Sequence, residues 1–170
     1  TVLESSASSI TIYTLMMLEG TEFKNPAFRK KHDYKTKYRI IPLNFGEYNG
    51  EKIFDFEEVG IATKDLSFDD YLSLRSIALM VEALYNGKPY NEFFQYAKEH
   101  DIKFADFLNY LHQNIDKSPS SVKKIFDEFV NETKSELWDN EQDLINFYKI
   151  KENYQKLIDG KVGGNLIYKY

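Results

Sequence analysis

Residues 38–63 read YRIIPLNFGEYNGEKIFDFEEVGIAT and contain two strand-like runs separated by a turn. The runs, residues 38–45 and 52–63, are rich in β-branched and aromatic residues, and the segment between them, residues 46–50, is turn-prone. The pattern predicts a β-hairpin. Because Pro42 cannot donate a hydrogen bond to a neighbouring strand, the first arm is expected to be an edge strand or an interrupted one.

The chain after residue 66 has the apolar spacing of helices. Ser67, with Asp70 three residues later, has the form of a capping box and starts a helix that is expected to end near Gly87. Apolar residues lie on nearly every side of this helix, which indicates that neighbouring elements enclose it. Further helices are predicted over residues 89–99 and 104–114, from Pro119 onward, and over residues 140–160 with Asn140 as the cap.

These segments predict an α+β fold that is mainly α. A short N-terminal β region, made of a strand at residues 10–18 and the hairpin, precedes a C-terminal region of five helices. The expected domains are residues 1–66 and residues 67–170.

Composition narrows the classes of function. The net charge of -5 argues against a nucleic-acid partner, because such proteins gather Lys and Arg on one face. The 170 residues include no cysteine, which excludes a thiolate nucleophile and a cysteine-ligated metal within the chain. The three histidines lack metal-binding spacing, and no motif of a catalytic site occurs. No apolar run is long enough to cross a membrane and no secretory signal is evident, so a cytoplasmic location is expected.

Two charged groups stand out inside apolar segments. Asp55, Glu57 and Glu58 share one predicted strand, with Asp55 and Glu57 on a solvated face and Glu58 on the opposite face with the phenylalanines. Arg75 lies in the most apolar helix and needs a carboxylate, for which Glu58 is the predicted partner. The alternative for Arg75 is a substrate carboxylate or phosphate.

Two stretches resemble a known family. Residues 15–23, Leu-Met-Met-Leu-Glu-Gly-Thr-Glu-Phe, are similar to the segment in which the last strands of a radical S-adenosylmethionine (SAM) barrel end in a Gly-Thr pair. The second stretch runs from Thr36 to Arg75 and includes FGEY, FDFEEV and LSFDDYL. It resembles the region that follows the barrel in radical SAM proteins of the cobalamin-binding kind.

The resemblance implies that the chain is the C-terminal part of such an enzyme, without its cluster-binding segment. Members of the family hold a four-iron four-sulfur cluster through a CxxxCxxC motif and bind SAM, and some bind cobalamin; these cofactors are implied for the parent and not for this piece. The implied partner is the upstream core of the same parent chain. Because a barrel strand needs neighbours, residues before about Thr36 are expected to be poorly anchored in isolation.

The same resemblance implies roles for parts of the chain. Gly20 and Thr21 would lie at the mouth of the barrel, where they touch SAM or substrate, or where Gly20 only permits a tight turn. The helical half would close the substrate chamber and exclude water. No catalytic residue is assigned, and the chain alone is expected to be inactive. The substrate and the oligomeric state stay open.

Two other functions compete with this one. The chain could be a free-standing helical module whose acidic and aromatic surface binds a protein. The weakest alternative is a small enzyme that uses the Asp55, Glu57 and Glu58 carboxylates, because no base, nucleophile or metal motif accompanies them.

Overall fold

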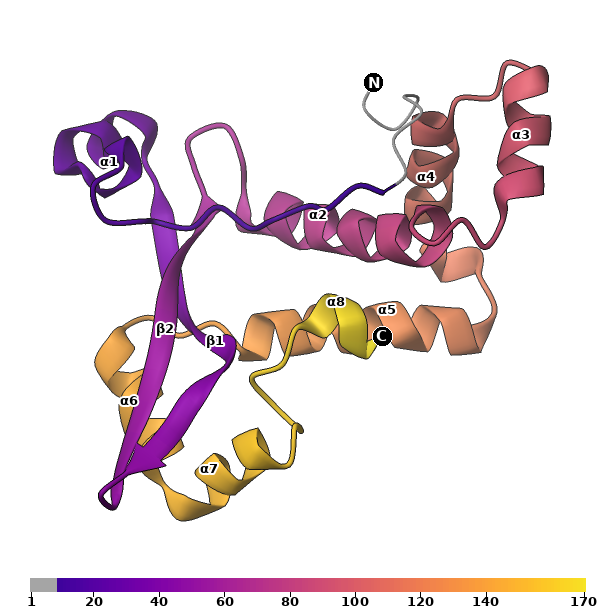
Figure 1. The fold of residues 1–170 in the computed structure, drawn as a ribbon. Helices are drawn as coiled ribbons and strands as arrows, with labels where there is room; N and C mark the ends of the chain where they lie inside the picture. The colour runs from indigo at the N-terminus through magenta and orange to yellow at the C-terminus, as the bar shows by residue number, and fades with distance from the viewer. Residues whose placement is uncertain (1–8) are drawn as a thin grey trace. The chain divides into compact units, whose positions relative to one another are not determined.

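The computed structural model describes residues 9–170 and confirms the mainly helical α+β class (Figure 1). Among the described residues, a two-stranded antiparallel sheet is accompanied by helices and by short 3₁₀ and π segments. The elements in chain order are η2 (Glu22–Lys24), α1 (Pro26–His32), β1 (Lys35–Tyr48), β2 (Glu51–Ala62), α2 (Phe68–Met80), η3 (Val81–Tyr85), α3 (Asn91–Glu99), α4 (Phe104–Gln113), η4 (Ile115–Lys117), α5 (Ser120–Ser135), α6 (Glu141–Lys149), α7 (Lys151–Ile158) and α8 (Leu166–Lys169).

The hairpin is confirmed, and its first arm is interrupted where Pro42 predicts. Phe45 pairs with Phe54 near the turn and Ile40 pairs with Phe56 beyond it. β1 therefore has four residues between these pairs where β2 has only Asp55, and Leu43 in this bulge has a φ of 64°. The three extra residues change the register of β1 against β2. Counting from the turn therefore does not tell which side chains of β1 share a face with those of β2.

The segment at residues 10–18 differs from the predicted strand. Only Met16 pairs, in a single antiparallel bridge with Val59 of β2. Gly60 has no side chain, which leaves room for the Met17 side chain beside β2. A Cβ at position 60 would lie 2.7 Å from Cε of Met17. One edge of residues 15–17 is thus anchored on β2.

Two compact units are formed by interleaved parts of the chain. One unit contains residues 14–71 and 131–169, and the other contains residues 72–130 together with Tyr170 and the described residues before 14. The predicted domain boundary between residues 66 and 67 stays a prediction.

In the first of these units, α6 and α7 lie beside the hairpin half that ends in the turn (Figure 1). Their core is aromatic and aliphatic, and its buried members are Ile40, Phe54, Leu144, Tyr148, Tyr154 and Leu157. The predicted helix over residues 140–160 is divided at Ile150, which has an extended conformation with ψ 129°. The break places Tyr148 and Tyr154, one from each helix, against the ring of Phe54.

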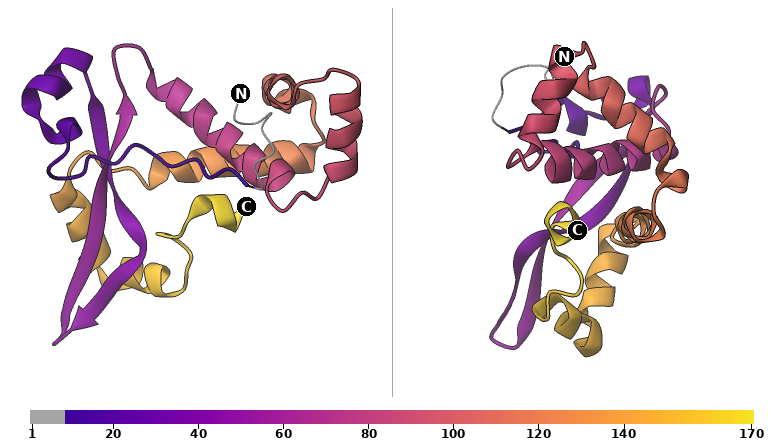
Figure 2. Two further views of the ribbon diagram at one scale, coloured as in Figure 1. Left: turned by 45° about the horizontal axis from the view of Figure 1, so that its top comes forward. Right: turned by 90° about the vertical axis from the view of Figure 1, so that its right-hand side faces the viewer.

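The other unit is helical (Figure 2). Its core joins the end of α2 to α4 and α5 through Met80, Val81 and Leu108, with Phe126 packed against them. The first turn of α2, over residues 68–71, belongs to the first unit, and the predicted capping box there is confirmed: the Asp70 amide donates to the Ser67 hydroxyl oxygen and the Ser67 amide donates to the Asp70 carboxylate. The final turns, over residues 81–85, are a π-helix.

Candidate functional site

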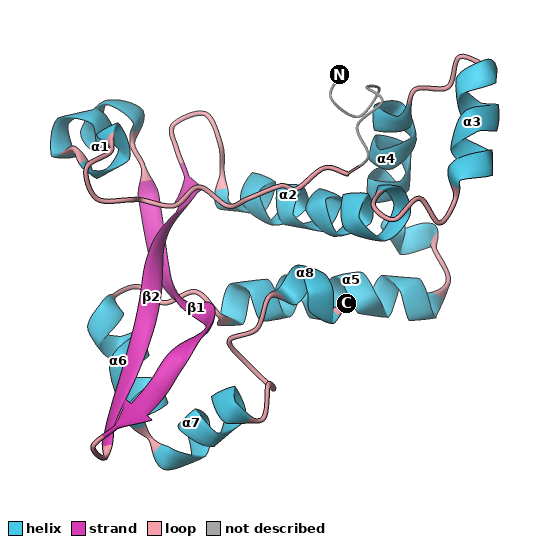
Figure 3. Ribbon diagram, viewed as in Figure 1, coloured by secondary structure: helices cyan, strands magenta, loops and turns pink. Residues whose placement is uncertain are grey.

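The strongest candidate site surrounds Glu58, which lies near the end of β2 and close to the start of β1. Figure 3 shows α1 at this end of the hairpin. Glu58 lies opposite Tyr38 in the sheet, and its face also holds Thr36 of β1. α1 is started by Asn25, whose side-chain oxygen accepts hydrogen bonds from the amides of Ala27 and Phe28, and by Pro26 at the first helical position. The helix ends at Asp33, which adopts a left-handed conformation.

The Glu58 cluster consists of Glu58, Lys24, Arg29 and Thr36. The Lys24 ammonium lies 2.8 Å from Oε2 of Glu58, and a guanidinium nitrogen of Arg29 lies 2.6 Å from Oε1. The Thr36 hydroxyl also donates to Oε1 and itself accepts a hydrogen bond from Arg29. Every partner of the carboxylate is thus a donor, which favours its charged form.

Glu58 is buried and its charge is stabilised there. Burial alone would raise the pKa of Glu58, but the hydrogen bonds from Lys24, Thr36 and Arg29 outweigh this effect and lower the pKa from 4.5 to about 2. The same contact raises the pKa of Lys24. Glu58 is therefore a fixed anion at neutral pH, and it is unsuited to proton transfer.

A second ion cluster lies on the opposite face of the hairpin. Arg39, paired with Glu57 across the sheet, donates to the Glu57 carboxylate at 2.6 Å, to that of Glu136 at 3.0 Å and to the Thr14 hydroxyl at 2.9 Å. Burial opposes the charge of Arg39, and Glu136 and Glu57 restore it, so that the pKa of Arg39 is raised overall. The prediction that Asp55 and Glu57 both lie on a solvated face is therefore wrong for Glu57, whose side chain is 12% exposed. It is confirmed for Asp55, which is exposed.

The three acidic residues of β2 do not form one site. Glu57 and Glu58 point to opposite faces; Glu57 binds one cation and Glu58 binds two, while Asp55 is solvated. This geometry removes the paired carboxylates on which an acid-base enzyme would depend.

Gly20 and Thr21 form a turn. Gly20 has a φ of 79°, and no atom lies within 4 Å of the position of a Cβ. The Thr21 hydroxyl donates to the carbonyl oxygen of Leu18 at 2.6 Å. The φ of Gly20 is one that glycine adopts most readily, and contact of Gly20 and Thr21 with a ligand stays a prediction.

Arg75 is buried, with 8% of the residue exposed, and its guanidinium lies over the ring of Phe129 at 5.5 Å from the centroid. A ring face attracts a cation and offsets part of the cost of burial. The predicted ion pair between Arg75 and Glu58 stays a prediction. Glu58 has cations of its own that the sequence reasoning did not identify.

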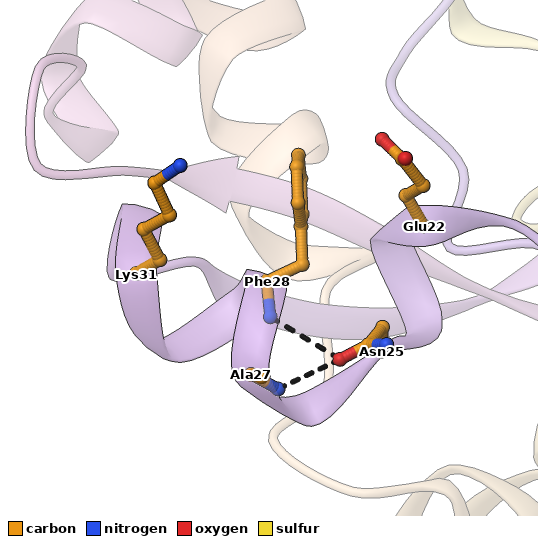
Figure 4. A pocket seen from close by; sticks show the side chains of 5 residues that line it. All are labelled: Glu22, Asn25, Ala27, Phe28 and Lys31. Atoms are coloured by element: carbon orange, nitrogen blue, oxygen red, sulfur yellow. Dashed lines mark hydrogen bonds between the residues drawn. The ribbon is translucent and has the colours of Figure 1, made fainter.

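A shallow hollow of about 270 Å³ lies on the surface of η2 and α1 (Figure 4). Phe28 stands between Lys31 and Glu22, while Asn25 is turned inward as the helix cap. These are surface side chains without a buried polar group among them, so the hollow has no feature of a catalytic site.

Within residues 9–170, no group of three His, Asp or Glu side chains could hold a metal ion, and the sequence has no cysteine. No helix among the described residues is both long and apolar enough to span a membrane.

A comparison of the chain with protein-family models finds no match, and a comparison with curated proteins finds none either.

Six residues of the two ion clusters were not predicted from the sequence; they are Thr14, Lys24, Arg29, Thr36, Arg39 and Glu136. One signal could have found part of them. Residues 24–39 contain seven of the 22 Lys and Arg residues but only one acidic residue, Asp33, in a chain that is acidic overall. Such a basic segment next to a run of acidic strand residues indicates pairing between the two.

Proposed function

We propose that the chain is the C-terminal accessory region of a radical SAM enzyme of the cobalamin-binding kind. In this role it closes or shapes the substrate chamber and performs no radical chemistry of its own. Its partner is the upstream core of the same polypeptide.

The observation that carries the proposal is that the two stretches that resemble the family contact each other through hydrogen bonds and lie next to a shared ion pair. The Met17 amide donates to the carbonyl oxygen of Glu58 at 2.8 Å, and the Gly60 amide donates to the carbonyl oxygen of Leu15 at 2.8 Å. The Glu58 side chain binds Lys24, which follows the first stretch directly. A shared origin in one enzyme explains why these segments are similar to the family in the same order and also contact one another.

The residues of this chain do not fit an iron-sulfur cluster, which needs thiolate ligands. A cluster in the parent would therefore be held elsewhere. The open surroundings of Gly20 offer no enclosed cradle for SAM by themselves. Under this proposal the chain forms one side of the chamber and excludes water from it, and two partly buried ion clusters stabilise its fold.

The test is to determine the coding sequence upstream of Thr1 and to purify its product without oxygen. The proposal expects a CxxxCxxC motif in the same reading frame. It also expects that truncation of the parent after residue 66 retains the iron but lowers the yield of product. A truncated parent with full product yield would refute the role in closing the chamber.

A second candidate is a free-standing protein-interaction module. It is favoured by the aromatic residues that α3, α4 and the turn before α3 leave exposed, which are Tyr90, Phe93, Tyr96 and Tyr110. Aromatic side chains are enriched where proteins bind one another. An initiator Met immediately before Thr1 would support this candidate and refute the first.

A further inference from the structure

The tripeptide Tyr-Asn-Gly occurs twice in the chain, as residues 48–50 and as residues 85–87. Asparagine is one of the thermolabile residues. It is most reactive before glycine, because the backbone nitrogen that follows can then approach the side-chain amide without a Cβ in the way. The two copies share this local sequence, so a large difference in their reactivity in the folded chain would come from the structure around them.

The first copy forms the tip of the hairpin. Asn49 and Gly50 have φ values of 52° and 79°, as a type I′ turn requires, and Tyr48 pairs with Glu51 across them. These four residues are exposed, and no atom lies within 4 Å of the position of a Cβ on Gly50. Among the residues that the structure describes, none forms a hydrogen bond with the Asn49 side chain. Such a loop tip opens locally at a small cost in free energy.

The second copy is held by hydrogen bonds. The side-chain oxygen of Asn86 accepts a hydrogen bond from the Ile10 amide at 2.9 Å. The side-chain nitrogen donates to the Ile10 carbonyl oxygen at 3.0 Å and to the Glu82 carboxylate at 2.5 Å. Because these bonds must break before the Asn86 side chain can turn toward the next backbone nitrogen, the structure protects it from attack.

We propose that Asn49 is a site of spontaneous deamidation and that the fold protects Asn86 from the same reaction. The Gly50 nitrogen forms a bond to Cγ of Asn49, and the bond from Cγ to the side-chain nitrogen breaks. That nitrogen leaves as ammonia and takes the proton that Gly50 loses. Water then opens the cyclic imide at either of its carbonyl groups, which gives aspartate or isoaspartate. Both products add a negative charge at the turn, and isoaspartate also lengthens the backbone there by a carbon.

Peptide mass analysis of the folded 170-residue chain, incubated in mildly basic buffer, tests this reaction. Replacement of an amide by a carboxyl group changes the peptide mass, and the fragments of the peptide locate the change. Conversion of Asn49 is expected to be at least about 10-fold faster than conversion of Asn86. Equal rates at the two positions, or a faster reaction at Asn86, would overturn the proposal.

The same incubation in guanidinium chloride is the control for local sequence. The unfolded chain lacks the hydrogen bonds of Asn86, so the two asparagines are expected to react at similar rates. If Asn86 stays slow in the unfolded chain, its protection does not come from the fold and the proposal is wrong.

Removal of one of these hydrogen bonds tests the protection directly. Glu82→Ala is expected to speed the conversion of Asn86 in the folded chain by about 5-fold and to leave the rate at Asn49 unchanged as an internal control. An unchanged rate at Asn86 in this variant would refute the protective role of the Glu82 contact. The reaction needs only the chain and water, so these outcomes do not depend on the proposed function.

Discussion

Replacement of Glu58 by Gln tests the buried ion cluster. The variant keeps the size of the side chain and an acceptor for Thr36, but it leaves the charges of Lys24 and Arg29 without their buried counterion. The Glu58 side chain is 5% exposed, whereas those of Lys24 and Arg29 are each 28% exposed. Removal of one partner of a fully buried pair costs about 3 to 5 kcal/mol, and the partial exposure of the cations reduces the expected cost to about 2 to 3 kcal/mol.

The lowered pKa of Glu58 expresses the effect of the same contacts as a dependence of stability on pH. A decrease from 4.5 to about 2 corresponds to roughly 3 kcal/mol of folding free energy at neutral pH. Because the pKa is lower in the folded state than in the unfolded state, this stabilisation is fully present above pH 4.5 and is lost as the pH falls from 4.5 towards 2. The unfolded chain binds the additional proton over this range, so acid destabilises the wild type more than the Gln variant.

The assay is urea unfolding followed by the fluorescence of Trp138, the single tryptophan of the chain. Trp138 exchanges two backbone hydrogen bonds with Tyr38, which lies opposite Glu58 in the sheet, so its emission reports on this region. Asp55→Asn is the matched control, since it removes an exposed carboxylate from the same strand and is expected to change stability by less than about 0.5 kcal/mol. A cost below about 0.5 kcal/mol for Glu58→Gln, or equal acid sensitivity of the variant and the wild type, would refute the reasoning.

Other changes test separate parts of the structure. Arg39→Met should lower the unfolding free energy by about 2 to 4 kcal/mol, because it removes the guanidinium that the partly buried carboxylates of Glu57 and Glu136 both bind, and a measured change near zero would contradict the structural role of Arg39. Gly60→Ala should lower the free energy of unfolding by about 1 kcal/mol, because its Cβ would lie 2.7 Å from Cε of Met17 and 3.2 Å from Cδ2 of Leu15, and the end of the flexible Met17 side chain must shift. Gly46→Ala in the same hairpin meets no atom within 4 Å and should leave the melt unchanged; equal effects of the two variants would refute the steric argument. Arg75→Ala should lower the free energy of unfolding by about 3 kcal/mol if Arg75 is a structural cation. If Arg75→Met leaves Tm unchanged or raises it, the result would instead support a role in binding a ligand.

The fold class could be predicted because the signals that define it are local. The hairpin follows from two β-rich runs around a turn, and the start of α2 follows from the Ser67 and Asp70 pair. The division of the last long helix at Ile150 could not be predicted, because no proline or glycine marks it. It is favoured by the packing of Tyr148 and Tyr154 on Phe54, which is a tertiary effect.

The charged residues of β2 could be predicted to need partners, but the partners themselves could not. A bulge of three extra residues in β1 exchanges the two faces of that strand relative to the turn, so Arg39 meets Glu57 and Thr36 lies on the face of Glu58. Arg29 reaches Glu58 from α1, a short helix whose start depends on the Asn25 cap and was not predicted.

The iron content of the protein encoded by the complete natural reading frame tests the central claim most directly. It should be measured after purification without oxygen, beside the 170-residue chain as the control. The accessory-region proposal predicts about four iron atoms per parent molecule, held by a CxxxCxxC motif upstream of Thr1, and none in the 170-residue chain. A parent without iron and without that motif, or stoichiometric iron in the 170-residue chain itself, would contradict it.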